Sequence, residues 1–146
     1  MTLPELLVLD TNCFIYLFEE SDQPRGRYLV EHVLRPAARG ERRLLTSTLV
    51  LAELLVQPHR LGLPHRADAL SRAVTSLPGL VVRPVDLSIA SVAARLRGSS
   101  GTSLPDAIVL ATAVDAGAAL LTNDQRLARA GSSQPVLVLD ALVEAA

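Results

Sequence analysis

Four acidic side chains stand at points of the sequence where they could take part in chemistry, and Asp10 is the first of them. It directly follows the apolar run 6–9, which is typical of a buried strand. In open α/β sheets ligands bind in the crevice outside the carboxyl ends of the strands, so we expect Asp10 to face a ligand. The alternative is that Asp10 only breaks the strand or caps the helix after it.

Glu53 is the only charged residue in the segment 44–56. It stands between Ala52 and Leu54, so we expect its carboxylate to be shielded from solvent. A buried carboxylate without a partner is costly, and no Lys or Arg lies within one helical turn of it. Glu53 therefore needs a metal ion, a base or an Arg from elsewhere in the fold.

Asp106 and Asp124 each stand where a helix is expected to begin. Ser103 and Asp106 match a capping box, and the segment 120–124 is another apolar run that ends in a hydroxyl, an amide and an acid. Capping alone would explain either acid. The start of a helix also favours negative charge, however, so an acid there can be held ionised and directed at a cation. Taken together, the four acids indicate a shared site more strongly than any one of them does.

Short apolar runs alternate with helical patterns along the whole chain. This alternation predicts a three-layer α/β/α sandwich around a short central parallel sheet. Pro58 is expected to end a helix, and the stretch 98–103, rich in Gly and Ser, to be flexible. Strands are expected near residues 5–9, 44–46, 80–82, 118–121 and 135–139, and helices near residues 12–20, 24–38, 49–56, 61–76, 87–96, 104–116 and 124–130.

The composition fits a single small domain over residues 1–146. Of the 146 residues 49% are hydrophobic, but only 3% are aromatic and none is Trp, so stacking platforms for nucleic-acid bases are not expected. The net charge of -1 gives no overall attraction to phosphate, although all 14 basic residues are Arg. Any nucleic-acid contact would be mainly to the backbone.

Neither the Cys nor the His residues suggest a metal site of their own. Cys13 is the single cysteine and is expected to be buried helix filler, and His32, His59 and His65 lack ligand-like spacing. The N-terminus carries no basic leader, and the longest apolar stretches are too short for a membrane span. We therefore expect a soluble, cytoplasmic protein with no membrane contact.

The motifs around the four acids resemble, in order and spacing, those of PIN-domain nucleases. The size and layout are most similar to the VapC-type toxins of bacterial toxin-antitoxin pairs. The resemblance implies that Asp10, Glu53, Asp106 and Asp124 are the catalytic and metal-binding acids of a metal-dependent endoribonuclease. It also implies an RNA substrate, a cognate antitoxin protein and a homodimer. The motifs are the segments 10–12, 49–55, 104–108 and 121–124, and the supporting polar positions are Thr11, Asn12, Ser47, Thr122 and Asn123.

Carboxylate ligands without thiol or imidazole imply one or two Mg²⁺ or Mn²⁺ ions rather than Zn²⁺. Such ions would activate a water for phosphodiester hydrolysis. We expect Asp10 and Asp106 to be the principal ligands. Glu53 would be a ligand or would orient the water, and Asp124 would be an outer or second-metal ligand.

Two other functions are considered beside the nuclease. A phosphatase of the haloacid-dehalogenase type would use Asp10 as nucleophile, but the second Asp of that motif is here Asn12 and the chain has no Lys. A binding module that kept the fold and lost activity is the other alternative. The mean hydropathy of +0.33 also suggests an apolar partner surface, for which we expect Phe14, Leu17, Phe18 and the helix 49–55.

Overall fold

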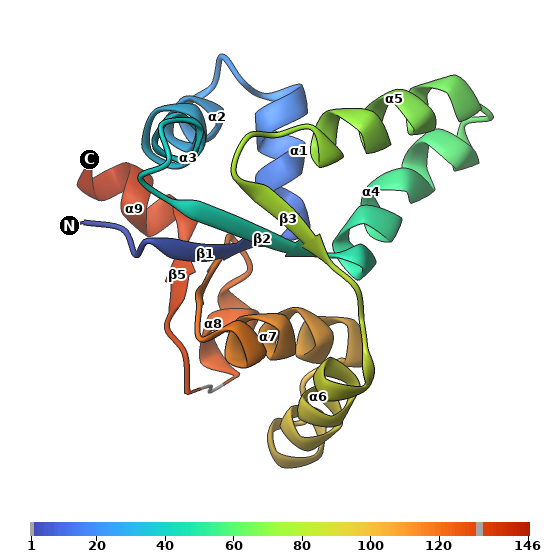
Figure 1. The fold of residues 1–146 in the computed structure, drawn as a ribbon, viewed down its shortest axis with the longest axis vertical. Helices are drawn as coiled ribbons and strands as arrows, with labels where there is room; N and C mark the ends of the chain where they lie inside the picture. The colour runs from blue at the N-terminus through green and yellow to red at the C-terminus, as the bar shows by residue number, and fades with distance from the viewer. Residues whose placement is uncertain (1, 131–132) are drawn as a thin grey trace.

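A five-stranded, all-parallel sheet forms the centre of the molecule, in a computed structural model that describes residues 2–130 and 133–146 (Figure 1). The strand order is β3-β2-β1-β4-β5. Each strand predicted from the sequence is present, with ends shifted by at most one residue. The strands are β1 (Leu6–Leu9), β2 (Arg43–Ser47), β3 (Leu80–Arg83), β4 (Ala119–Thr122) and β5 (Val136–Val138).

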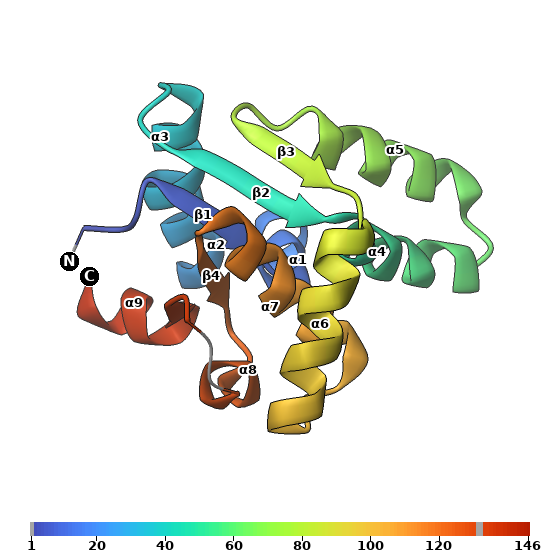
Figure 2. The same ribbon diagram turned by 60° about the horizontal axis from the view of Figure 1, so that its bottom comes forward.

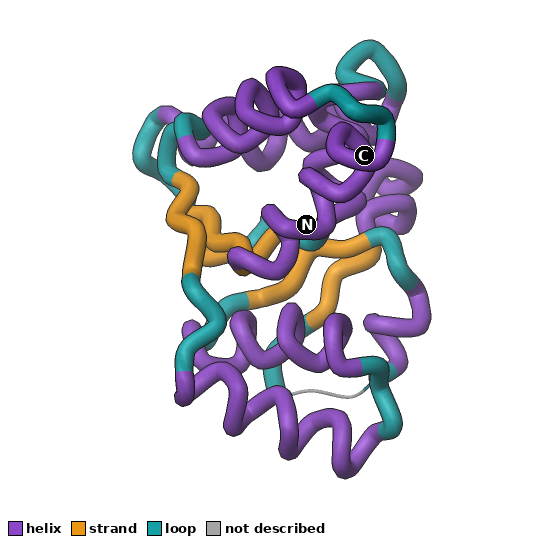
Figure 3. Tube along the Cα trace, turned by 90° about the vertical axis from the view of Figure 1, so that its right-hand side faces the viewer, coloured by secondary structure: helices purple, strands orange, loops and turns teal. Residues whose placement is uncertain are grey.

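Helices cover both faces of this sheet, which confirms the predicted three-layer sandwich (Figures 1 and 3). Helix α7 packs on one face against β1, β2 and β4, and α6 packs on the outside of α7. Helices α1 and α4 lie on the opposite face. The helices are α1 (Thr11–Glu19), α2 (Pro24–Leu29), α3 (Arg35–Ala38), α4 (Thr48–Arg60), α5 (Pro64–Thr75), α6 (Leu87–Ser100), α7 (Leu104–Ala116), α8 (Gln125–Arg129) and α9 (Leu139–Ala145), with a π-helical segment η1 (Val30–Leu34) between α2 and α3.

The neighbouring strands β1 and β4 place the first site residues at the carboxyl edge of the sheet. Leu7, Val8 and Leu9 of β1 are completely buried, because helices cover both faces of the strand. Burying each such side chain contributes roughly 1.5–3 kcal/mol. The register pairs Leu9 with Leu121, so the residues that follow them, Asp10 and Thr122, emerge together at the carboxyl edge of the sheet.

The predicted helix 24–38 is continuous, and Pro36 does not end it early. Proline has no N–H to donate to the carbonyl four residues before it, which here belongs to His32. The helix widens into the π-helical segment η1 just before Pro36, and the His32 carbonyl accepts a hydrogen bond from the Arg42 guanidinium at 2.7 Å. The freed acceptor is therefore satisfied by a residue from outside the helix.

Two predicted helix ends were wrong. Pro58 lies inside α4, which continues to Arg60, so this proline does not close the helix. Helix α6 was expected to end near residue 96 but continues to Ser100, so residues 98–100 of the stretch expected to be flexible are helical; the Ser100 hydroxyl donates to the Leu96 carbonyl at 2.7 Å. Gly101, with φ of 70°, then ends the helix in the left-handed conformation.

The C-terminal helix α9 was not predicted. The expected strand over residues 135–139 is shorter, and the chain turns into a helix at Leu139. Figure 2 shows α9 beside the two chain ends, away from α6 and α7. Within the described part of the chain, no helix combines the length and the apolar character needed to cross a membrane.

Candidate active site

The four predicted acids come from different parts of the sequence and meet at one edge of the sheet. Asp10 follows β1 and Asp124 follows β4, while Glu53 lies on α4 and Asp106 in the first turn of α7. The negative charges of Asp106 and Asp124 both raise the pKa of Asp10, and those of Asp10 and Asp106 raise the pKa of Glu53. The fold therefore brings these carboxylates within electrostatic range of one another.

Asp10 is fixed by hydrogen bonds to both of its carboxylate oxygens. Its Oδ1 accepts the backbone N–H of Thr11 at 2.8 Å, which caps α1, and its Oδ2 accepts the Thr122 hydroxyl at 2.7 Å. Burial, with a smaller contribution from the charges of Asp106 and Asp124, raises the pKa of this carboxyl more than these two bonds lower it. Asp10 thus both caps a helix and holds a partly buried negative charge in a defined orientation.

Asn12 and Thr122 form the support behind Asp10. The Oδ1 of Asn12 accepts the Asn123 backbone N–H at 3.1 Å, so its Nδ2 can donate to the Thr122 hydroxyl oxygen at 3.3 Å. Thr122 also accepts the Asp124 backbone N–H at 3.0 Å. With two donors at its oxygen, the Thr122 hydroxyl must direct its one proton to Asp10.

Asn123 supports the site from one step further away, through residues that the sequence did not single out. Its side chain accepts the Asp140 backbone N–H at 3.0 Å and donates to the Tyr16 hydroxyl at 3.1 Å. Asp140 in turn forms a two-pronged salt bridge with Arg25 at 2.7 and 2.8 Å. Helices α1, α2 and α9 are thereby tied to the loop after β4. These contacts join residues far apart in the chain, so the sequence pattern did not reveal them.

Glu53 differs from the sequence prediction because its residue is exposed, not buried. The helix α4 turns this position toward solvent beside α1, where Glu53 accepts a hydrogen bond from the Thr11 hydroxyl at 3.1 Å. Partial burial of the carboxyl, followed by the charges of Asp10 and Asp106, raises its pKa. The expected alternative, an Arg from elsewhere in the fold, is not found among the described residues.

Asp106 and Ser47 both lie at helix starts. The Ser103 hydroxyl accepts the Asp106 backbone N–H at 3.4 Å, so Ser103 caps α7 as the sequence predicted. The carboxylate of Asp106 is half-buried, and no salt bridge to it occurs in residues 2–130 and 133–146. Ser47 is fully buried, and its hydroxyl caps α4 by accepting the Leu49 N–H at 3.1 Å. Its role is local.

Asp124 is the one of the four acids that has a cationic partner among the described residues. Its Oδ1 caps α8 by accepting the Arg126 backbone N–H at 2.9 Å, and its Oδ2 lies 3.3 Å from Nη2 of Arg126. Burial of Asp124 would raise its pKa, but the hydrogen bonds and charge of Arg126 outweigh this and lower it. Arg126 was not predicted from the sequence, although its position two residues after Asp124 was a signal.

The donor set at this edge suits a hard divalent cation. Carboxylate oxygens predominate. Burial is the main cause that raises the pKa values of Asp10 and Glu53, and repulsion by the neighbouring acids adds to it; a cation would relieve that repulsion. In the described part of the chain, however, no three His, Cys, Asp or Glu residues are already grouped closely enough to hold an ion. Cys13 is completely buried in α1, as predicted, and its sulfur lies 3.4 Å from the Leu121 carbonyl oxygen and 3.7 Å from Oδ1 of Asn12.

The predicted partner surface is partly wrong. Phe14 and Leu17 are buried in the protein's own core, because they occupy the face of α1 that packs on the sheet. Phe18 is 39% exposed, as is Ile15, and Val56 on the neighbouring α4 is 45% exposed.

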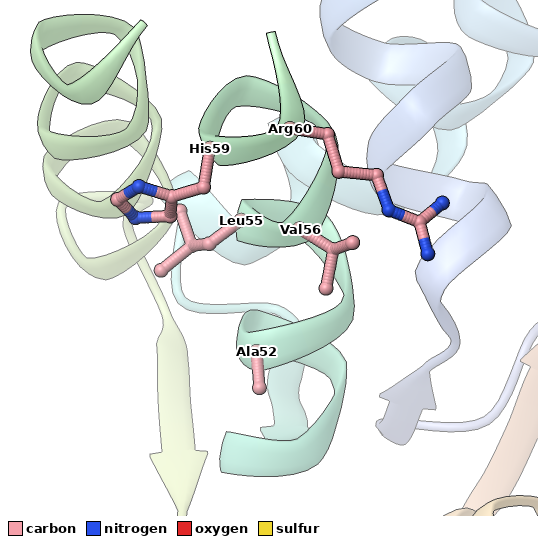
Figure 4. Close-up of a pocket in the computed structure, with 5 residues that line it drawn as sticks. All are labelled: Ala52, Leu55, Val56, His59 and Arg60. Atoms are coloured by element: carbon pink, nitrogen blue, oxygen red, sulfur yellow. The ribbon is translucent and has the colours of Figure 1, made fainter. Parts of the chain in front are cut away.

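A pocket of about 430 Å³ lies along α4 beside this surface. Figure 4 shows Leu55 and His59 on the α5 side of the helix and Val56 and Arg60 on the α1 side; Ala52 completes the lining.

The fold and this acidic edge define an α/β protein with a carboxylate site at the ends of its central parallel strands. The sequence model of the PIN domain family matches residues 7–132, and the chain belongs to that family. A comparison with curated protein sequences gave no significant match.

Among the solved structures with the same fold are three that share 18–20% of their sequence with this chain. A chain of VapBC2 from Rickettsia felis, bound to a DNA fragment from its promoter, is 18% identical, with a TM-score of 0.70 over 90% of this chain and 96% of that one. A chain of FitAcB from Neisseria gonorrhoeae is 20% identical, with a TM-score of 0.70 over 91% and 97%. VapC20 from Mycobacterium tuberculosis, described as a Sarcin-Ricin loop cleaving toxin, is 20% identical, with a TM-score of 0.65 over 86% and 95%.

Proposed function

We propose that this protein is a metal-dependent endoribonuclease and the toxin of a toxin-antitoxin pair. The observation that carries the proposal is the meeting of Asp10, Glu53 and Asp106 at one sheet edge. The carboxylates of Asp10 and Glu53 accept hydrogen bonds from hydroxyls and a backbone N–H, and none of the three acids forms a salt bridge in the described chain. Membership of the PIN domain family and the likeness to VapC20 support it.

The residues of this chain have separable tasks in the proposed reaction. Asp10 and Asp106 would hold Mg²⁺ or Mn²⁺, one ion or two, with Asp124 as an outer or second-metal ligand. A bound divalent cation supplies a more acidic water and neutralises charge on the phosphate. Thr122 keeps Asp10 aimed at the site. Glu53, held by the Thr11 hydroxyl, is placed either to bind the ion or to orient the attacking water.

The test is cleavage of a mixed RNA pool by the purified chain in Mn²⁺, Mg²⁺ or EDTA. We expect fragments in the presence of metal and none in EDTA. An Asp10→Asn variant purified in the same way controls for contaminating nucleases. The proposal fails if wild type and Asp10→Asn produce the same fragments, and a chain that binds RNA without cutting it would be a binding module.

We also propose that an antitoxin protein and a second copy of the chain bind this protein. The exposed Ile15, Phe18 and Val56, next to the α4 pocket, supply an apolar surface for one of them. A solved structure from Klebsiella pneumoniae that shares the fold, with 23% identity and a TM-score of 0.60, is described as a toxin-antitoxin complex, which supports an antitoxin partner. Light scattering that finds only monomer, unchanged by co-expression with a neighbouring antitoxin-like reading frame, would contradict the proposal.

A further inference from the structure

Arg126 is the only Arg in the described residues that forms a salt bridge with one of the four acids. It lies on the short helix α8 (Gln125–Arg129), and the negative charge of Asp106 also attracts its guanidinium. The Arg126 side chain is 83% exposed, whereas that of Asp124 is 27% exposed. The guanidinium therefore lies on the solvent side of the acids, where an incoming substrate would arrive.

Among the described residues, the pair formed by Arg126 and Asp124 has longer contacts than the other guanidinium–carboxylate pairs that are joined by hydrogen bonds. Its two side-chain contacts measure 3.3 and 3.5 Å, whereas Arg83 reaches Asp115 at 2.7 Å. Exposed ion pairs with long contacts contribute little stability, so this one can be exchanged at small cost.

Asp124 does not depend on the guanidinium for its position. Its Oδ1 accepts the Arg126 backbone N–H at 2.9 Å, and the Asp124 backbone N–H donates to Thr122 at 3.0 Å. These bonds remain if the Arg126 side chain swings away. The acid can then keep its place and offer Oδ2 to a cation.

We propose that Arg126 exchanges anions: it pairs with Asp124 before metal binds, and with a phosphate of the nucleic-acid substrate once a divalent cation occupies the acids. This inference rests on the proposed nuclease function. Arg suits the role because its planar guanidinium binds phosphate through two parallel hydrogen bonds. Arg126 would be a substrate-binding residue and would also set the affinity of the site for metal.

The proposal predicts two effects of opposite sign for Arg126→Gln. Mn²⁺ should bind about threefold more tightly or better, as measured by electron paramagnetic resonance of the free ion, because a competing cation has been removed. The KM for RNA should rise on the order of tenfold, with kcat little changed, because one charged phosphate contact has been lost. The slope of log KM against log salt should fall by about 0.7, the value for one contact to a single strand.

Arg129→Gln is the matched control. It removes the same charge from the same helix, but the partner of Arg129 is the neutral Gln125 side chain at 3.5 Å. We expect neither tighter Mn²⁺ binding nor a tenfold change in KM. If both variants changed Mn²⁺ affinity and KM equally, Arg126 would act only through its contribution to the overall charge, and the proposal would be overturned.

The metal measurement separates this proposal from the proposed function. If wild type cleaves no RNA, the nuclease function fails, while tighter Mn²⁺ binding by Arg126→Gln would still establish the competition at Asp124. If RNA is cleaved but Arg126→Gln leaves both Mn²⁺ affinity and KM unchanged, the exchange is wrong and the nuclease function stands.

Discussion

The two ends of helix α7 place carboxylates in opposite environments. At its last turn, Asp115 accepts hydrogen bonds from the Arg83 guanidinium and the Ser88 hydroxyl, both at 2.7 Å, and these lower its pKa. At its first turn, Asp106 has no salt bridge in the described chain, and its charge adds to the burial that raises the pKa of Asp10. One helix thus presents a paired, structural acid and an unpaired acid.

The difference separates acids that join elements through Arg side chains from acids whose carboxylates have no Arg partner in the described chain. Asp115 joins β3 and α6 to α7, and Asp140 joins α9 to α2 through Arg25 in the same way. Asp10 and Glu53 instead have hydroxyl partners, which orient a carboxylate without neutralising it. Like charges held close together without a counter-charge cost free energy, and the cation proposed above would relieve this cost.

The strongest test of this comparison exchanges one oxygen at each end of α7. Asp106→Asn should reduce RNA cleavage by a factor of a thousand or more, roughly 4 kcal/mol of transition-state stabilisation, because it removes an anionic ligand. Asp115→Asn should leave the cleavage rate within about twofold, since its contacts lie outside the site. Single-turnover cleavage of one RNA by both variants makes the measurement. Similar cleavage rates for the two variants would show that the acids at the two ends of α7 do not differ in function.

A second test is the effect of metal on stability. A ligand that binds only the folded state at a hundredfold excess over Kd adds about 2.7 kcal/mol, or roughly 5–10 °C in Tm for a chain of this size. Mn²⁺ should therefore raise the Tm of the wild type and of Asp115→Asn, but much less that of Asp10→Asn. Thermal melts with Mn²⁺ and with EDTA check this. An equal rise in all three proteins would place the ion elsewhere.

The smallest expected effect is the pH dependence of stability without metal. The raised pKa of Asp10 means that its charge destabilises the fold at neutral pH, and this cost disappears as the pH falls through the raised pKa. The lowered pKa of Asp115 means that its charge stabilises the fold above its unfolded pKa, and this gain is lost as the pH falls through the lowered pKa.

In EDTA near pH 7, Asp10→Asn should therefore raise the free energy of unfolding relative to wild type, and Asp115→Asn should lower it by about 1 kcal/mol or less. Both differences should shrink on acidification, that of Asp115→Asn at the lower pH. Urea unfolding over a pH series measures both. Two differences of the same sign would show that the two acids do not differ in the way their contacts suggest.

Much of the fold and the order of the site could be predicted because the signals are local. The apolar runs at 6–9 and 118–121 are long enough to mark buried strands, and an acid or hydroxyl after each marks the carboxyl edge. Parallel pairing then places Asp10 beside Thr122 almost without choice. The caps at Ser47 and Ser103 follow from short-range chemistry in the same way.

Only the tertiary structure decided which side chains face solvent and which polar groups find each other. The rotation of α1 about its axis buries Phe14 and Leu17, and the packing of α4 beside it turns Glu53 outward, opposite to what its apolar neighbours indicated. The link from Asn123 to Asp140 and the pairing of distant Arg25 with Asp140 depend on where helices dock. Sequence periodicity fixes which residues share a face, but the direction of that face is set by contacts between segments far apart in the chain, which no local pattern encodes.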